Sequence, residues 1–289
     1  MKKILLPLIF LTTLISSCSS NEGEIVKSKE TLSNYKISFV SGDEFTHYFD
    51  GDKGIRTKNK DNFDITTFEY NNDKLNNHST FRSNNSINES YTFVYDTDGN
   101  ITSTKEIGVY SSLNQSDVYT REFTYNNNSI ISKVPHELFT DKKYIIEIKL
   151  NDTGLIEEFS KKDSESNELS AQFNFSYDEN ENCTTVIKKV NFGGTIYEST
   201  VNNTYDNKIN PLYKHYRSNY IPYLIIYGKS SLFGNDITSL VRTFGKNNIT
   251  ATNDVYFEYE YNNNDYPTSN SVKQKGTNTL SYTTEFNYN

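Results

Sequence analysis

The sequence predicts an all-β protein, an antiparallel meander of about 14–16 strands in seven or eight hairpin repeats, rolled or closed into a barrel-like shape. Two observations predict this fold. Aromatic residues recur at every second position in many short stretches, which is the period of an extended strand. A tyrosine followed by asparagine or aspartate ends most of these stretches, at a spacing of roughly 25–30 residues that indicates an internal repeat.

The first strand of each repeat carries the rings. In the stretch FNFSY, Phe173, Phe175 and Tyr177 fall on one face of a strand, and the polar residues between them fall on the other. We therefore expect the ring face to be the core. The tyrosines that end these stretches are Tyr70, Tyr95, Tyr125, Tyr177, Tyr205, Tyr261 and Tyr288.

The repeat is imperfect in two places. Leu150 stands where the other units carry the final tyrosine. A further unit is expected near residue 233, where the aromatic signature is absent. The stretch around Leu150 keeps the pattern of a hairpin, whereas the unit near residue 233 has lost its signature.

Turn-forming residues follow the tyrosines. Asp98 and Gly99, the run from Asn151 to Gly154, and several asparagine clusters tolerate positive φ and bond their own backbone. A second strand is expected to leave each turn, as in residues 100–107, 155–162 and 183–190.

Residues 209–236 interrupt the rhythm. They contain two of the five prolines, and 221–227 is the most apolar run outside the N-terminus. A barrel of about 14 or more strands is too wide to be filled by its own side chains, unless the sheet flattens or stays open. We expect this irregular or helical insertion to pack on or inside the sheet, with residues 223–227 as a plug.

The N-terminus has the pattern of a targeting segment. Residues 1–17 combine two lysines with an apolar run too short for a spanning helix, which needs about 20 residues. The ending ISSC resembles a bacterial lipobox, which implies a lipid on Cys18 and attachment to a membrane. The alternative is an ordinary secretory peptide. The predicted organisation is a signal peptide (1–17), an anchored linker (18–34) and one repetitive β domain (35–289).

Composition limits the function. The chain has 29 basic and 37 acidic residues and a net charge of −8; without residues 1–17 it loses two lysines and reaches −10. An acidic chain repels phosphate backbones, which argues against nucleic acid as a partner. If Cys18 carries lipid, Cys183 is the remaining cysteine and no intrachain disulfide forms.

Several motifs together resemble a known family. The turn YDTDGN at Tyr95 resembles the tyrosine-aspartate repeat of Rhs-type β-shells. The lipobox, the EYEYN strand, YDNKINP from Tyr205 and YNNNDYPTS from Tyr261 resemble uncharacterised Bacteroidetes lipoproteins, a domain of unknown function described as having a porin-like fold. This resemblance covers most of the mature chain and implies a rolled antiparallel sheet and an envelope location. It implies no catalytic residues.

The sequence contains no strong motif for a catalytic or metal-binding site. The Asp96–Asn100 stretch has acidic spacing reminiscent of calcium loops but lacks the required Gly and Glu, so we interpret it as a turn. His47, His78, His136 and His215 fall in different repeats without metal-ligand spacing. We interpret Cys183 as a half-buried strand residue. The sequence predicts no enzyme, no metal and no cofactor.

The aromatic residues of the irregular segment lie outside strand register. A candidate binding surface is therefore formed by Tyr213, Tyr216, Tyr220 and Tyr223. Its ligands would be envelope proteins, glycans or peptides.

The predicted function is a binding or structural module, lipid-anchored in the envelope of a Gram-negative bacterium, at the outer membrane. A transmembrane porin-like channel is the first alternative, although a membrane strand needs about 9–11 residues with an apolar outer band. The second is an envelope hydrolase with a site scattered over several strands.

Overall fold

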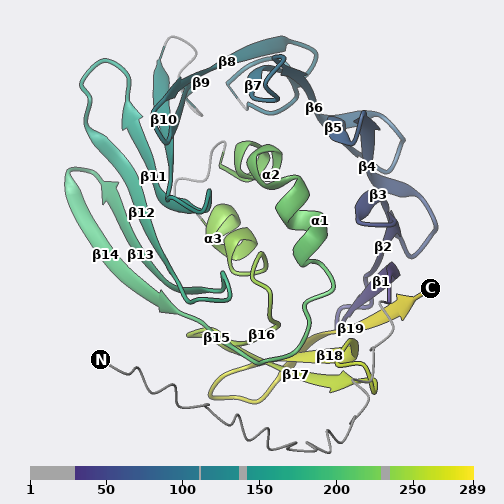
Figure 1. Cartoon of the computed structure of the whole chain (residues 1–289). Helices are drawn as coiled ribbons and strands as arrows, with labels where there is room; N and C mark the ends of the chain where they lie inside the picture. The colour runs from purple at the N-terminus through teal and green to yellow at the C-terminus, as the bar shows by residue number, and fades with distance from the viewer. Residues whose placement is uncertain (1–29, 111, 137–141, 229–234) are drawn as a thin grey trace, which may run out of the picture.

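The structure is a computed structural model that describes residues 30–110, 112–136, 142–228 and 235–289. Its 19 strands form one antiparallel meander, and the first strand also pairs with the last. The sheet curls into a nearly closed barrel around three short helices (Figure 1). The predicted all-β, barrel-like fold is confirmed.

The strands follow one another along the chain. They are β1 (Leu32–Phe39), β2 (Glu44–Asp50), β3 (Lys53–Asn59), β4 (Asp64–Asn71), β5 (Lys74–Phe81), β6 (Ile87–Tyr95), β7 (Ile101–Ile107), β8 (Val118–Asn126), β9 (Ser129–Pro135), β10 (Lys143–Leu150), β11 (Ile156–Asp163), β12 (Leu169–Tyr177), β13 (Cys183–Phe192), β14 (Thr195–Asn202), β15 (Thr204–Tyr205), β16 (Ile249–Ala251), β17 (Val255–Tyr261), β18 (Pro267–Gln274) and β19 (Leu280–Tyr288). The helices are α1 (Tyr213–Ser218), α2 (Tyr220–Tyr227) and α3 (Asn235–Val241).

The structure has more strands than the expected 14–16, because some strands do not carry the repeat pattern and others are very short. The N-terminal strands β1–β3 lack the tyrosine-asparagine ending, and β15 and β16 have two and three residues. The first strand begins at Leu32, inside the segment expected to be a linker. The unit without an aromatic signature falls in the predicted insertion, where α2 and α3 flank residues 229–234.

One seam of the barrel stays unsealed. β14 pairs with β13, and β16 pairs with β15 and β17. Within the described ranges, no strand ladder joins β14 to β16 or β17. The wall is therefore continuous from β15 through β19 and β1 to β14, and open between its two ends.

Asparagines form the turns as predicted. Nine described non-glycine residues have positive φ, and eight of them are Asn or Asp. Asp96 illustrates the mechanism, because its carboxylate accepts the Asn100 backbone N–H at 2.8 Å and closes the turn between β6 and β7. The Asp96 hydrogen bond agrees with the interpretation of residues 96–100 as a turn.

The helices α1–α3 of the insertion lie inside the barrel (Figure 1), which agrees with the prediction that this segment packs on or inside the sheet; we call the three helices the plug. In α2, Tyr220, Tyr223 and Leu224 to Ile226 are buried, and Pro222 sits in the first turn, where a missing N–H is tolerated. A helix that is apolar all round must be enclosed, and the barrel encloses it. In the described part of the chain, no helix has the length and apolar character needed to cross a membrane.

A buried ion pair ties the plug to the wall. Glu106 on β7 and Arg121 on β8 are both fully buried, 3.9 Å apart. Thr104 donates to Glu106 at 2.6 Å, and Arg121 donates to the Ile225 carbonyl of α2 at 3.3 Å. Removing either partner would leave a buried charge uncompensated, which is costly.

The final tyrosine of each repeat has a polar role that the alternation alone did not predict. Its hydroxyl donates to a backbone carbonyl at the start of the second strand of the preceding hairpin, a contact that we call a tyrosine tie. The ties run from Tyr70 to Gly54 (3.0 Å), Tyr95 to Leu75 (2.7 Å), Tyr125 to Ile101 (3.1 Å), Tyr177 to Ile156 (2.8 Å), Tyr205 to Cys183 (2.9 Å) and Tyr288 to Pro267 (2.8 Å). Tyr261 donates to Asp206 instead.

Candidate functional site

The largest described cavity lies at one rim of the barrel, between four hairpin turns and the junction of α1 and α2. We call it the rim cavity; its volume is about 710 Å³. Its floor is apolar and its mouth is polar. Its lining includes Lys74, Tyr95, Asn100, Tyr125, Asn127, Asn128, Ile130, Leu150, Asn151, Asp152, Arg217, Asn219 and Tyr220.

Two neighbouring tyrosines form one wall of the rim cavity. The hydroxyls of Tyr95 and Tyr125 are held in tyrosine ties. Burial is the main cause that raises the pKa of both phenols, so they stay neutral. The Lys74 ammonium lies 5.2 Å from the centre of the Tyr95 ring. Tyr125 is 39% exposed, so part of its side chain remains accessible.

The repeat is broken where the cavity opens. Leu150, at the end of β10, stands where a tie would be, and it lines the cavity together with Ile130 of the neighbouring strand. Leucine has no hydroxyl to donate and a smaller side chain than tyrosine. The one unit of the printed sequence that replaces the final tyrosine with leucine therefore borders the largest described cavity.

Polar groups from the turns and the plug face this space. Asn100, Asn127, Asn128 and Asn151 come from three successive turns. Asn219, between α1 and α2, is 1% exposed; its amide donates to the His215 carbonyl at 3.2 Å, and its Oδ1 accepts no hydrogen bond. A buried acceptor without a donor is a place where a water or a ligand hydroxyl is favoured.

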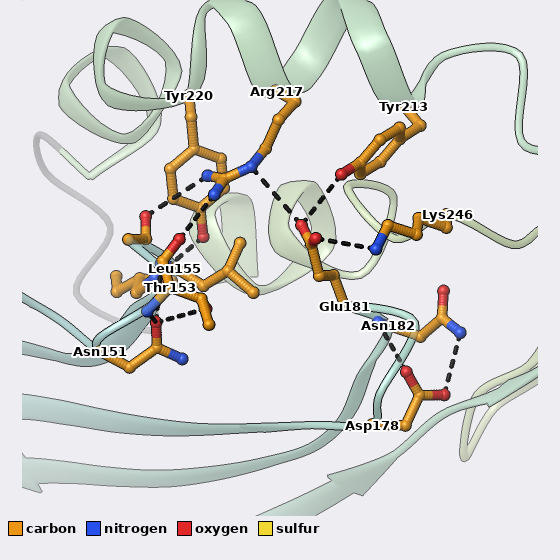
Figure 2. Close-up of polar contacts among 12 residues, drawn as sticks. Asn151, Thr153, Leu155, Asp178, Glu181, Asn182, Tyr213, Arg217, Tyr220 and Lys246 are labelled. Atoms are coloured by element: carbon orange, nitrogen blue, oxygen red, sulfur yellow. Dashed lines mark hydrogen bonds and ion pairs between the residues drawn. The ribbon is translucent and has the colours of Figure 1, made fainter.

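The plug is fixed to the rim beside the cavity (Figure 2). Arg217 donates to the Thr153 carbonyl at 2.7 Å and lies 3.5 Å from Glu181. Lys246 approaches the same carboxylate at 3.0 Å, and Tyr213 donates to it at 3.1 Å.

These contacts set the charge of the carboxylate. Burial alone would raise the pKa of Glu181, but hydrogen bonds from Lys246 and Tyr213 and the nearby Arg217 charge hold that pKa below its usual value. Tyr220 completes the attachment, since its hydroxyl accepts the Ile156 N–H at 3.0 Å. Burial raises the pKa of Tyr220 to about 12.

A second cavity of about 550 Å³ lies on the other side of the plug, against β1–β6; we call it the inner cavity. Three of the four histidines line it, although their sequence positions gave no sign of this: His47, His78 and His215. Tyr35 stacks on His47 with ring centres 4.3 Å apart, and Phe68 lies 4.9 Å from His78. His136 lies elsewhere, stacked on Tyr144.

Two histidines of the inner cavity, His47 and His215, are held neutral. Burial lowers the pKa of His47 to about 4, with a further contribution from His215, and burial lowers the pKa of His215 to about 4. His215 Nδ1 accepts the Gly54 N–H at 3.0 Å, and its Nε2 bonds the Tyr223 hydroxyl at 2.7 Å. Among the described residues, no group of three or more His, Cys, Asp or Glu side chains is placed to hold a metal ion.

The four tyrosines of the predicted binding surface do not form one surface. Tyr220 lines the rim cavity, Tyr216 and Tyr223 line the inner cavity, and Tyr213 lines a smaller one. Tyr220 and Tyr223 are 4% and 2% exposed. A helix turns its side chains through 100° per residue, so consecutive aromatic residues in α1 and α2 face different spaces.

Cys183 lines none of the cavities described above. Cys183 is completely buried at the start of β13, more so than expected, and burial raises its thiol pKa to about 12. Such a thiol is inert rather than nucleophilic. Cys18 and the predicted signal peptide lie outside the described residues.

No protein-family model matches the chain, and no curated protein matches it. Solved structures are similar to it at low identity. A porin-like protein from Bacteroides uniformis ATCC 8492 has 13% identity and a TM-score of 0.47, covering 89% of this chain and 98% of its own. The TcdB2–TccC3 structure has 10% identity and a TM-score of 0.32, covering 85% of this chain and 16% of its own.

The Tc holotoxin pore of Photorhabdus luminescens has 9% identity and a TM-score of 0.28, covering 83% of this chain and 11% of its own. Similarities of this size carry no inference about ligand or activity. The barrel-like β fold implied by the Bacteroidetes resemblance is present. Membership of that family, the tyrosine-aspartate repeat and the lipid anchor remain predictions.

Proposed function

We propose that the protein is a non-catalytic binding module of a bacterial cell envelope, anchored through Cys18, which holds a saccharide in the rim cavity. Saccharides are recognised by side-chain amides that bond their hydroxyls and by aromatic rings that cover their apolar faces. The rim cavity offers both, and its volume lies within the usual range of about 300–1,000 Å³ for ligand sites.

The observation that carries the proposal is Leu150, which stands where other units have the tyrosine that makes a tyrosine tie. Six of the seven units that end in tyrosine use it to fasten neighbouring hairpins, with a net gain of about 1 kcal/mol per hydrogen bond. The unit that omits it lines an open space with amides from three turns. We interpret this omission as the feature that makes room for a ligand.

Binding is favoured over hydrolysis by the composition of the cavity wall. Glycoside hydrolysis uses a pair of carboxyl groups on either side of the scissile bond. Among the described residues that line the rim cavity, Asp152 is the one carboxylate, and it sits on an exposed turn. Hydrolysis at this site would need a second carboxylate.

A membrane-spanning channel fits the wall less well. The outward positions of β12 are Gln172, Asn174 and Ser176, and ion pairs lie on the outside of the barrel, such as Lys273 with Glu258 at 2.7 Å. A spanning barrel has the opposite arrangement, with an apolar band outside. We therefore place the barrel in water, held at the membrane by its anchor.

The test is binding of a panel of envelope and dietary oligosaccharides by calorimetry, with the wild type, Leu150→Tyr and the matched control Leu150→Met. We expect Leu150→Tyr to fill the cavity and abolish binding while the melting temperature stays equal or rises. Leu150→Met, which conserves volume, should bind like the wild type. Absence of binding by the wild type to every sugar, or undiminished binding by Leu150→Tyr, would contradict the proposal.

Two further measurements address the alternatives. Chromatography of each bound sugar after prolonged incubation should return it intact; shortened products would indicate a hydrolase. Membrane fractionation of Cys18→Ala should release the protein, and retention after a carbonate wash would contradict the anchor.

A further inference from the structure

Among the described residues, the outer edge of β14 is the long strand edge at the open seam of the barrel. β14 pairs with β13 at eight positions without a register shift. Its residues from Thr195 to Thr200 are all exposed. Within the described part of the chain, no strand pairs with its other edge. In Figure 1, β14 is the outermost strand beside the seam.

The register shows which backbone groups face the open edge. The Asn203 N–H donates to the Thr184 carbonyl at 2.8 Å, so this pair is hydrogen-bonded across β13 and β14. Antiparallel ladders alternate hydrogen-bonded and non-bonded pairs. The backbone groups of Ile196, Glu198 and Thr200 therefore point away from β13.

A side-chain amide already bonds the backbone of β14 at one end of this edge. The side-chain amide of Asn253 accepts the Asn202 N–H at 3.0 Å and donates to the Thr200 carbonyl at 2.6 Å. These are the bonds that an adjacent strand would make. Beyond them, Ile196 and Glu198 remain as the next positions on the edge.

The edge has few of the protections that natural sheets use. Edge strands are usually guarded by lysine, proline or a bulge. β14 contains none of these. Around its open end, Phe192, Ile196 and Tyr197 are 68%, 57% and 60% exposed.

We propose that a second copy of the protein pairs with this edge, so that two β14 strands run antiparallel across a two-fold axis at Tyr197. Because Asn253 occupies the far end, Ile196 and Glu198 are the positions left for pairing. An axis at Tyr197 places Ile196 of one copy opposite Glu198 of the other, and each such pair exchanges both backbone bonds. The result is a closed two-fold dimer.

The charges allow this register. Glu198 is the one charged residue of β14, and Lys189 on β13 of the same copy neutralises it at 3.3 Å. In the proposed register each Glu198 faces an isoleucine rather than the other Glu198. The exposed rings of Phe192 and Tyr197 would lie near the axis, where they would lose contact with water.

Cysteine cross-linking tests the register in the full chain carrying Cys18→Ala. Residues opposite each other in a non-bonded pair have Cα atoms about 4.5 Å apart, within the range for a disulfide. Tyr197→Cys should therefore give a covalent dimer on air oxidation. The control Thr195→Cys lies on the same face, but its two thiols would be about 14 Å apart in the dimer and should form no disulfide. Cys183 is buried and does not interfere.

Proline tests the backbone bonds by sedimentation velocity across a concentration series. The Glu198 N–H points away from β13, so Glu198→Pro removes an intermolecular donor and leaves the β13 ladder intact. We expect the wild type and the control Glu198→Gln to dimerise, and Glu198→Pro to remain monomeric with an unchanged melting temperature. A monomeric wild type at every concentration, equal dimerisation of Glu198→Pro, or cross-linking of Thr195→Cys instead of Tyr197→Cys would overturn the proposal.

Discussion

Strands β12 and β17 carry almost the same pattern, FNFSY and FEYEY, yet they have different surroundings. On β12, Phe173 and Phe175 are 0% and 5% exposed. On β17, Phe257 and Tyr259 are only half-buried and border a cavity of about 170 Å³. The alternation fixes which face the rings take in both strands. The position of the plug decides how tightly those rings are packed.

The contacts of the plug explain this difference. Tyr220 bonds the Ile156 N–H of β11, and Arg121 of β8 donates to the α2 backbone. At the end of α2, a Cβ added to Gly228 would lie 3.1 Å from the Phe159 ring of β11. The walls formed by β1–β5 and β17–β19 border the inner cavity and the smaller cavity. Apart from the rim cavity, which lies at one end of β6–β10, the barrel therefore has a packed half, β8–β13, and a hollow half, β1–β5 with β17–β19.

The largest expected change in the free energy of unfolding comes from truncating a core side chain in the packed half. Phe173→Ala should lower the free energy of unfolding by about 3–5 kcal/mol, because it leaves a cavity in rigid surroundings. The matched change Phe257→Ala should cost about half as much, since its ring is already partly exposed. Urea denaturation of both variants measures the difference, and equal losses would contradict a division into two halves.

The hollow half should make stability depend on pH. His47 and His215 have pKa values near 4 when folded and about 6.5 when unfolded. Between these values the unfolded chain binds more protons, so the stabilising contribution is complete above pH 6.5 and is lost as the pH falls towards 4.

The expected loss is about 3 kcal/mol per histidine at most. Urea denaturation at a series of pH values measures it, and His47→Gln should flatten the slope. A free energy of unfolding that stays constant between pH 6.5 and 4 would show that these imidazoles are not held neutral by burial.

The smallest expected effect concerns the tyrosine ties. Tyr177→Phe in the packed half and Tyr288→Phe in the hollow half each remove one hydrogen bond of 2.8 Å. Both should cost about 1 kcal/mol, because the ring stays in place and only the hydroxyl is lost. Thermal denaturation compares them. A large loss in the packed half alone would mean that the tie depends on packing.

Much of the fold could be predicted because strand alternation and turn chemistry are local. The ring faces of β6, β12 and β17, the turn at Asp96 and the buried segment 221–227 all follow from neighbours within a few residues. The four scattered histidines gave no such signal. His47, on β2, meets His215, on α1, only because the sheet closes around the plug.

The candidate site was only partly visible in the sequence. Leu150 was seen as a variant of the repeat, but its consequence depends on the tie that a tyrosine would make to the neighbouring hairpin. Tyr220 was expected at a binding surface, and it instead lies buried at the floor of the rim cavity.

By itself, the sequence determined the strands, their buried faces, their turns and the segment that fills the barrel, because a period of two and turn-forming asparagines act over short range. The tertiary structure decided which side of the barrel the plug fills, which cavities remain and where the seam stays open. Those outcomes depend on contacts between residues far apart in the chain, which no local pattern encodes.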